Sequence, residues 1–168
     1  MFNNNTFISI GSNLRGHMHN PKYIMDIVFH NLSNQGLRVR YASKIYKSKP
    51  SPSGFGPLFY NRVILIKTNL NPTDILKRLK KIEKIYSKRS SQKNSPRVLD
   101  LDILDYKGKI INKKNYLQIP HPKMYDRDFI LKPLHDLSPY WIDPINGKSI
   151  KSLIYNYKRS NISIAKAI

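Results

Sequence analysis

The pattern of apolar and polar positions predicts four strands in the first 104 residues. Apolar runs with strand-like alternation or many β-branched residues occur at 7–10, 37–41, 62–66 and 98–104. The first run leads into Gly11-Ser-Asn, a turn-forming sequence. Proline, glycine and serine crowd the chain before the third run, so we expect a loop there.

Two amphipathic helices are predicted between these strands. Asn20 before Pro21 is typical of a helix start, because asparagine caps free amides and proline suits the first helical position, and Gly36 marks the end. Asn71-Pro72 repeats the start signal. The apolar positions that recur at helical spacing, and that we expect to face the core, are Ile24, Ile27, Val28 and Leu32 in the first helix and Ile75, Leu79, Ile82 and Tyr86 in the second.

The resulting order, β-α-β-β-α-β, predicts an α+β fold of the ferredoxin-like class, an antiparallel sheet with helices packed on one face. C-terminal additions follow, including a short helix near 126–137, and the residues after this helix give no clear periodic signal. Neither a repeat nor a linker divides the sequence, and 168 residues suit one compact unit. We therefore expect a single domain over 1–168.

Composition narrows the class of protein further. The chain has no cysteine, which excludes disulfides and thiolate zinc sites. The stretch from Met1 to Thr6 lacks the basic and apolar regions of a signal peptide, and no apolar run approaches membrane-spanning length. We expect a soluble, cytoplasmic monomer that makes no contact with membranes.

The charge points to a different class. The 30 basic and 10 acidic residues give a formal net charge of +20, and a strongly basic domain is typical of nucleic-acid-binding proteins. A basic nucleic-acid-binding module of ferredoxin-like fold is therefore one alternative. However, the lysines are spread along the whole chain, and the aromatic-rich signature of RNA-recognition domains is absent. We expect no specific nucleic-acid binding, and note that positive potential also attracts polyanions such as ATP.

The most informative stretch is KNSPRVLDLDIL at 93–104. On a strand, Asp100 and Asp102 project from one face, while the leucines and isoleucine around them project from the other. Two adjacent carboxylates need a compensating cation, and Mg²⁺ typically takes one or two carboxylates and leaves its other positions to water and phosphate oxygens. Arg97 adds a planar cation suited to phosphate. We interpret the stretch as a metal–nucleotide site.

Asp-x-Asp spacing has other uses as well. It occurs on solvated edge strands, where charge discourages edge-to-edge pairing. It also holds a metal diphosphate in some sugar transferases, so an Asp-x-Asp nucleotide-sugar transferase is a second alternative. A Walker A loop is absent, because GSNLRG at 11–16 lacks the required lysine and serine or threonine.

Six motifs occur in order between residues 7 and 134. They are FISIGSNL (7–14), YKSKP (46–50), FYNRV (59–63), PRVLDLDIL (96–104), IPHP (119–122) and RDFILKPL (127–134). Together they resemble the 6-hydroxymethyl-7,8-dihydropterin pyrophosphokinases of folate biosynthesis. This resemblance implies the ferredoxin-like fold and an ATP-dependent diphosphokinase. Such an enzyme transfers the terminal pyrophosphoryl group of MgATP to the pterin hydroxymethyl group and releases AMP.

The resemblance also implies roles for particular side chains. Two magnesium ions are expected at Asp100 and Asp102. The implied catalytic residues are Arg97, Asp100, Asp102, His121 and Arg127. The implied ATP-binding residues are Lys88, Arg89, Lys93, Arg97, His121 and Arg127. The implied pterin-binding residues are Asn13, Ser48, Phe59, Asn61 and Phe129, with the pterin ring held between the two phenylalanines.

Each of these residue types is also common in proteins without any role in binding or catalysis. A phenylalanine is most often part of a core, and a single histidine or arginine is often a surface residue. The sequence departs from the family at Ser95, where glycine or alanine is usual, and within 87–93, where lysine and serine replace arginine and glycine. Lysine keeps the charge of arginine but loses its paired hydrogen bonds, so the departures concern the phosphate contacts of Lys88 and Arg89.

Overall fold

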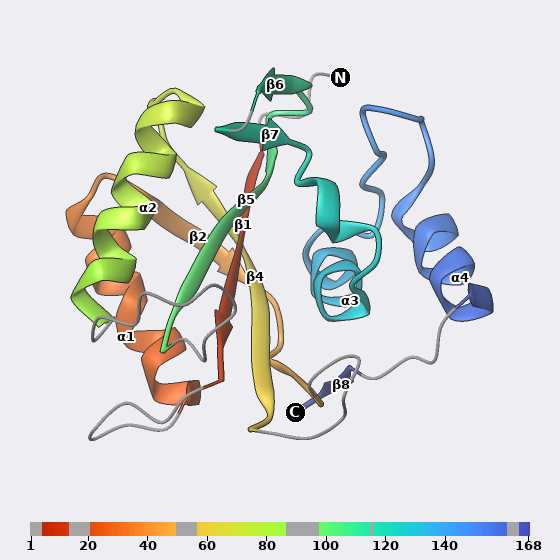
Figure 1. Ribbon diagram of the computed structural model, residues 1–168, viewed down its shortest axis with the longest axis horizontal. Coiled ribbons are helices and arrows are strands. Elements are labelled where there is room, and N and C mark those ends of the chain that lie inside the picture. The colour runs from red at the N-terminus through yellow and green to blue at the C-terminus, as the bar shows by residue number, and fades with distance from the viewer. Residues whose placement is uncertain (1–4, 14–20, 50–56, 87–97, 115, 161–164) are drawn as a thin grey trace.

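A central sheet lies between two layers of helices (Figure 1). The computed structural model describes residues 5–13, 21–49, 57–86, 98–114, 116–160 and 165–168. In chain order the elements are β1 (Thr6–Ser12), α1 (Pro21–Asn34), β2 (Arg38–Ala42), β3 (Tyr46–Ser48), β4 (Phe59–Lys67), α2 (Pro72–Tyr86), β5 (Asp100–Tyr106), β6 (Ile111–Lys113), β7 (Leu117–Ile119), the 3-10 helix η1 (Pro122–Met124), α3 (Asp128–Leu137), α4 (Ile150–Ser160) and β8 (Lys166–Ala167).

The main sheet has six strands in the order β5-β1-β4-β3-β8, with β2 also paired to β4. Every pairing in it is antiparallel. The predicted antiparallel sheet with helices is therefore confirmed. Strands and helices up to β5 follow the predicted order, except that the second predicted strand is followed by a further short strand, β3, before the loop.

The break between β2 and β3 has a local cause at Ser43. The backbone N–H of Ser43 donates to the carbonyl of Val63 (2.9 Å), and its hydroxyl accepts the N–H of Val63 (3.0 Å). Ser43, between β2 and β3, thus binds both the N–H and the carbonyl group of Val63 on β4. The chain then resumes pairing at Tyr46, opposite Asn61.

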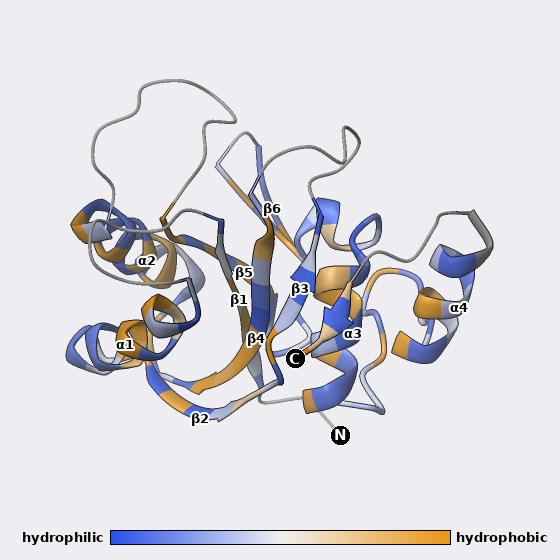
Figure 2. Cartoon of the chain, turned by 90° about the horizontal axis from the view of Figure 1, so that it is seen from below, coloured by the Kyte–Doolittle hydropathy of each residue, from blue (hydrophilic) through white to orange (hydrophobic). Residues whose placement is uncertain are grey.

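Helices α1 and α2 cover one face of the sheet and enclose the larger core. Ile8, Ile64 and Leu101 from three strands pack there with Val28 of α1 and Leu79 of α2. Figure 2 shows the apolar sides of both helices next to the apolar strands. The Asn71 side chain accepts the N–H of Asp74 (3.0 Å) and caps the start of α2, as the sequence predicts.

The prediction that Ile27 of α1 faces the core is wrong. Ile27 is 37% exposed, whereas Met25 is fully buried. Ile24, Val28 and Leu32 form the buried line at helical spacing. Met25 lies beside this line toward the core, and Ile27 lies beside it on the opposite side. Because both residues are apolar, hydrophobicity alone does not show which of them is buried.

The second face of the sheet is also covered, which corrects the expectation of helices on one face only. Phe7, Val63 and Leu104 project there and pack against α3, α4 and Trp141. The strands carry apolar residues on both faces of the sheet, so a second layer of helices is needed to exclude water from the second face. Within the parts of the chain that are described, no helix is both long and apolar enough to cross a bilayer.

Strand β5 lies at the edge of the sheet, and α2 holds it there. The backbone N–H of Leu101 donates to the Glu83 carboxylate (2.7 Å), which also accepts Lys80 Nζ (2.8 Å). Burial raises the pKa of Glu83, and the charge of Lys80 opposes this shift. The strand is thereby fixed at the residue between Asp100 and Asp102.

A buried carboxylate ties the end of β5 to the second core. Asp105 is fully buried and accepts hydrogen bonds from the Trp141 indole N–H (2.7 Å) and the Gly108 N–H (2.9 Å). Burial raises its pKa, and the Trp141 hydrogen bond opposes the shift. The two donors would have no acceptor if the carboxylate were removed.

We expect Asp105→Ala to lower the free energy of unfolding by about 1–3 kcal/mol, because it removes the acceptor of the buried Trp141 N–H and of the partly buried Gly108 N–H. Urea denaturation of the variant and the parent protein measures the difference. Asp126→Ala, which removes an exposed carboxylate, is the control and should change stability by less than about 0.5 kcal/mol. Equal stability of the two variants would contradict a structural role for Asp105.

Candidate active site

Four residues from four neighbouring strands form a row across the sheet. Asp100 on β5 pairs with Gly11 on β1, Gly11 pairs with Asn61 on β4, and Asn61 pairs with Tyr46 on β3. Directly paired residues of an antiparallel sheet point to the same face. The Tyr46 hydroxyl donates to Asp136 on α3 (3.1 Å), so the row lies on the α3 side.

Asp102 adds a second carboxylate two residues along β5, opposite Ser9. Asp100 and Asp102 are partly exposed, while Leu101 and Ile103 are buried against α1 and α2. This burial pattern confirms the predicted division of the strand into a packed face and a charged face. Two carboxylates on adjacent same-face positions are thus accessible to a cation.

Gly11 keeps the space between the carboxylates and the amide open. A Cβ atom at this position would lie 3.0 Å from Asn61 Oδ1 and 3.8 Å from the Asp100 Cβ. The first of these distances is shorter than ordinary contacts allow, so the Asn61 side chain would have to move. Sequence reasoning treated Gly11 as a turn residue and missed this role, which depends on the register of three strands.

The predicted pterin-binding residues of β3 and β4 lie together on this face. Ser48 pairs with Phe59, one row beyond Asn61. The Ser48 Oγ and the Asn61 Nδ2 are buried and find no hydrogen-bond partner among the described residues. Buried polar groups are nearly always hydrogen-bonded, so these two atoms are suited to a ligand. Asn13 is buried directly after the end of β1.

His121 is held beside β5 by its backbone. Its N–H donates to the Leu104 carbonyl (3.0 Å), and Pro122 begins η1. The ring Nδ1 accepts the N–H of Lys123 (3.2 Å), so the neutral ring carries its proton on Nε2. That Nε2 lies 4.0 Å from Asp102 Oδ2. The structure therefore brings two of the predicted catalytic residues together.

Burial lowers the pKa of His121 below its ordinary value of 6.5. The negative charge of Asp102 acts in the opposite direction, and the positive charges of Arg127 and Lys123 lower the pKa further. Because the net shift is downward, the imidazole is mainly neutral at pH 7. Its Nε2–H is a hydrogen-bond donor that carries no full charge.

The start of α3 adds a cation and an aromatic ring. Arg127 is the N-cap residue of α3, and its guanidinium carbon lies 5.7 Å from the centre of the Phe129 ring. Phe129 is partly buried and packs against the second core. Its ring therefore has a packing role in addition to any contact with a ligand.

Several predicted residues fall where the structure gives no description. Lys88, Arg89, Lys93 and Arg97 lie outside the described residues, as do Ser95 and the rest of 87–97. Glu83, in contrast, was not predicted from the sequence. One glutamate on a lysine-rich helix gives no signal that it binds the backbone of a distant strand.

The carboxylates of Asp100 and Asp102 can hold magnesium only together with other ligands. Among the described residues, no group of three or more His, Cys, Asp or Glu side chains could enclose a metal ion. Asp100 and Asp102 alone suit Mg²⁺ that completes its coordination with water and phosphate oxygens. The residues present therefore fit a metal that arrives with a nucleotide.

Comparison with known proteins gives the family. Residues 7–139 match 7,8-dihydro-6-hydroxymethylpterin-pyrophosphokinase (HPPK), and the chain belongs to this family. The match includes every predicted site residue, since these run from Asn13 to Phe129.

Curated relatives agree with this assignment. The folic acid synthesis protein fol1 of Pneumocystis carinii is 39% identical over 150 residues, which are 89% of this chain and 20% of that protein. The 2-amino-4-hydroxy-6-hydroxymethyldihydropteridine pyrophosphokinase of Synechocystis is 35% identical over 122 residues, covering 71% of this chain and 60% of that protein. The enzyme of the same name from Aquifex aeolicus is 33% identical, covering 86% of this chain and 87% of that protein.

The chain thus spans about a fifth to nine tenths of the length of these relatives. Among solved structures, wild-type HPPK-DHPS of Plasmodium falciparum with pteroate superposes with a TM-score of 0.77 at 17% identity. That superposition covers 98% of this chain and 48% of the other. At this identity the likeness shows the fold alone.

The balance of charges around His121 can be tested directly. We expect Asp102→Asn to lower the pKa of His121 further, because it removes the anion that opposes the effect of burial. NMR titration of the ring C–H signals measures the shift, and His121→Gln identifies the resonance. Arg127→Met should raise the same pKa. A pKa of His121 that is unchanged in both variants would contradict the geometry described here.

Proposed function

We propose that this protein transfers the terminal pyrophosphoryl group of MgATP to the hydroxymethyl group of 6-hydroxymethyl-7,8-dihydropterin, in folate biosynthesis. Membership in the HPPK family supports this reaction. The observation that carries the proposal is the row on one sheet face, in which Asp100 and a buried amide, Asn61, stand on either side of Gly11. A metal-bound phosphate and a polar heterocycle can therefore lie next to each other.

The pterin occupies the β3–β4 side of the row in this proposal. Asn61 and Ser48 supply the buried polar atoms that lack a partner among the described residues, and an amide can both donate to and accept from a pterin ring edge. Phe59 and Phe129 provide apolar surface for the flat ring, and Asn13 closes the site at the end of β1. Burial and hydrogen bonding together select for a flat, polar-edged substrate.

The triphosphate occupies the β5 side. Asp100 and Asp102 would hold two magnesium ions, which would neutralise phosphate charge there. His121 donates from Nε2 to a phosphate oxygen, and Arg127 supplies a full positive charge. Arg97, Lys88, Arg89 and Lys93 complete the nucleotide site from the segment outside the described residues.

The reaction requires alignment rather than a covalent nucleophile. The pterin hydroxyl oxygen forms a bond to the β-phosphorus and loses its proton to solvent, the bond from that phosphorus to the oxygen that bridges it to the α-phosphorus breaks, and AMP leaves with that oxygen. Positioning and electrostatic stabilisation supply most of the rate in such transfers. The row across β5, β1 and β4 provides the positioning, because each substrate lies on a different strand of one rigid sheet.

The finer features of the protein are part of the same proposal. The order β5-β1-β4 with β2 and β3 beyond it, and two helices on one face, supports a ferredoxin-like core extended by α3, α4 and β8. We infer one domain over 1–168, because both cores share the same sheet. A cytoplasmic monomer remains our expectation.

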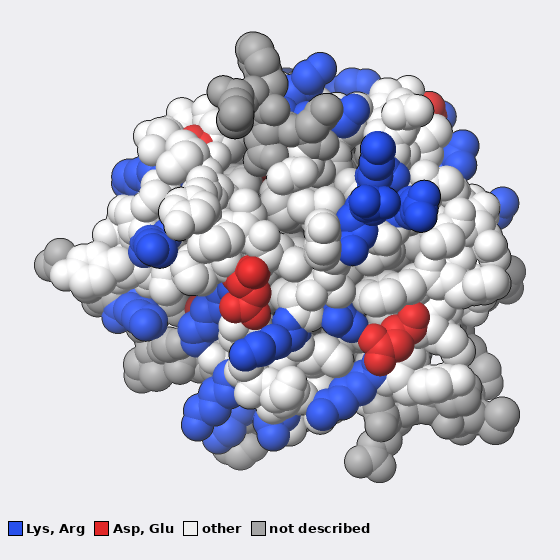
Figure 3. Space-filling view, turned by 180° about the vertical axis from the view of Figure 1, so that it is seen from behind, with Lys and Arg blue, Asp and Glu red and all other residues white. Residues whose placement is uncertain are grey.

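The two alternatives find less support. Lys and Arg side chains form several separate groups on the face in Figure 3, with acidic residues between some of them, instead of one continuous stripe. Nucleic-acid binding by such a surface would be weak and sensitive to salt. Membership in the HPPK family favours neither a nucleic-acid-binding module nor a sugar transferase.

The proposal predicts that Asp100→Ala and Asp102→Ala each lower AMP production by roughly 100-fold or more, because the triphosphate loses the ligands that orient it. The assay supplies MgATP and hydroxymethyldihydropterin and measures AMP. Both variants should unfold at a temperature no lower than the parent, since removal of one of two repelling carboxylates relieves strain. Asp126→Ala is the matched control. Parent-like AMP production by either site variant would refute the metal assignment.

A second prediction concerns the rings. Phe59→Ala and Phe129→Ala should each weaken pterin binding by roughly fivefold or more, while affinity for an ATP analogue changes little, because stacking acts on the pterin alone. Calorimetry with each ligand gives the two affinities. Phe29→Ala, on the opposite face and packed under Arg62, should lower stability without this selectivity. If both ligands weaken equally in the folded site variants, the rings serve only the core.

A further inference from the structure

The strand β8 joins the sheet at the edge next to the proposed pterin site. Ala167 pairs with Tyr46 and Lys166 pairs with Lys47, both on β3. The N–H of Ile168 also donates to the Ile45 carbonyl (2.9 Å). Because β3 carries Ser48, Lys166 and Ala167 extend the sheet beside one wall of that site.

A buried ion pair on α3 holds the same segment from the other side. Asp128 Oδ2 accepts both Lys132 Nζ (2.9 Å) and the backbone N–H of Ala165 (3.0 Å). Lys132 Nζ in turn donates to the Ala165 carbonyl (2.6 Å). The side chain of Asp128 is only 2% exposed and that of Lys132 is 19% exposed. Both backbone groups of Ala165 are therefore bound by one charge pair, which we call the clamp.

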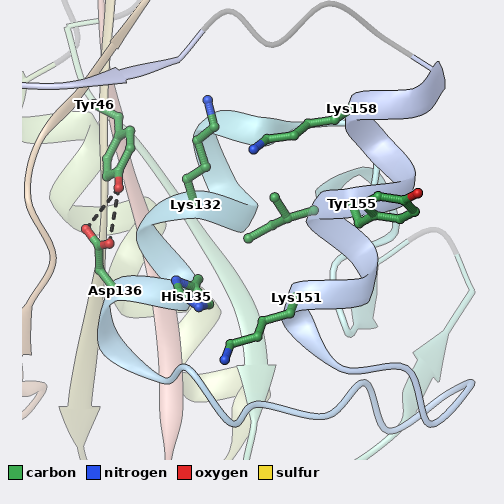
Figure 4. A pocket seen from close by; sticks show the side chains of 8 residues that line it. Tyr46, Lys132, His135, Asp136, Lys151, Tyr155 and Lys158 are labelled. Atoms are coloured by element: carbon green, nitrogen blue, oxygen red, sulfur yellow. Dashed lines mark hydrogen bonds between the residues drawn. The ribbon is translucent and has the colours of Figure 1, made fainter.

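The clamp lies in the turn of α3 that carries the proposed site residues. Asp128 stands between Arg127 and Phe129 in the sequence. In Figure 4, Lys132 rises from α3 toward the strand above it, while Tyr46 reaches down from β3 to Asp136. Burial and the charge of Asp136 raise the pKa of Tyr46 to about 12, so its hydroxyl stays protonated and donates. The two walls of the proposed pterin site, β3 and α3, are thus joined near both ends of α3.

We propose that Asp128 and Lys132, acting through residues 165–168, are positioning residues for the pterin site. They fix the distance between Phe129 on α3 and Ser48 on β3. This inference rests on the proposed function, since it assigns the same site. Neither residue of the clamp contacts a substrate; each acts by restricting the motion of a wall that does. Preorganisation of this kind raises affinity because less freedom is lost on binding.

The clamp should affect one substrate far more than the other. Of the described residues proposed to bind the triphosphate, Asp100, Asp102 and His121 lie outside α3 and β3, and only Arg127 stands at the start of α3. The pterin, in contrast, contacts both of the elements that the clamp joins. Loss of the clamp therefore weakens pterin binding selectively, which a general loss of stability would not do.

The test compares four variants of the full chain. Lys132→Met removes the donors but keeps the apolar stem, and Lys132→Arg restores charge and donors. A third variant lacks residues 165–168. Lys77→Met is the control, because Lys77 is an exposed lysine of a helical pair, 3.9 Å from Asp74 on α2. Calorimetry with hydroxymethyldihydropterin and with a non-hydrolysable ATP analogue gives the affinities, and thermal unfolding reports the fold.

We expect Lys132→Met and the truncated protein to bind pterin at least fivefold more weakly, with less than a twofold change for the ATP analogue. Lys132→Arg and Lys77→Met should match the parent within twofold. Unchanged pterin affinity in folded Lys132→Met overturns the inference, as does equal weakening of both ligands or loss of the fold in both clamp variants. A parent protein that binds no pterin refutes the proposed function itself, and so is distinguishable from failure of the clamp.

Discussion

The pairing of β1 with β4 on one side and β5 on the other is the constraint on which the site depends. Side chains alternate along a strand, so a shift of one residue would turn Asn61 or the aspartates toward α1 and α2. The register is held because Ile8 and Ile10 must remain in the larger core. The burial that stabilises the sheet therefore also places the polar row, and the site cannot be separated from the core beneath it.

Charge within the site is balanced by keeping one partner neutral. Asp100 and Asp102 repel each other, and a protonated histidine beside them would neutralise part of their negative charge. Burial instead lowers the pKa of His121, so the carboxylates keep their affinity for an external cation. The fixed positive charge comes from Arg127 at the start of α3. Among the described residues, the site thus combines accessible anions, a neutral donor and the permanent cation of Arg127, a set suited to a metal-bound polyphosphate.

Local signals in the sequence predicted the strands β1, β2, β4 and β5, the first two helices, the short helix α3, and the division of β5 into a packed and a charged face. What they could not predict depends on contacts between distant segments. The row from Asp100 to Tyr46 requires three registers, and the second layer of helices requires knowledge of what covers each sheet face. β8 has only two residues, too few for a periodic pattern, and the clamp at Asp128 needs the fold to bring Ala165 to it.

Glu83 has a consequence for how molecules of this protein meet one another. An edge strand presents unpaired backbone groups on which a strand from another molecule can add. Here the Leu101 N–H, in the middle of the charged edge, is already bound by a side chain of the same molecule. An incoming strand would have to displace a partly buried carboxylate that also holds Lys80. The residue that steadies the strand of Asp100 and Asp102 therefore also discourages that strand from seeding edge-to-edge aggregation.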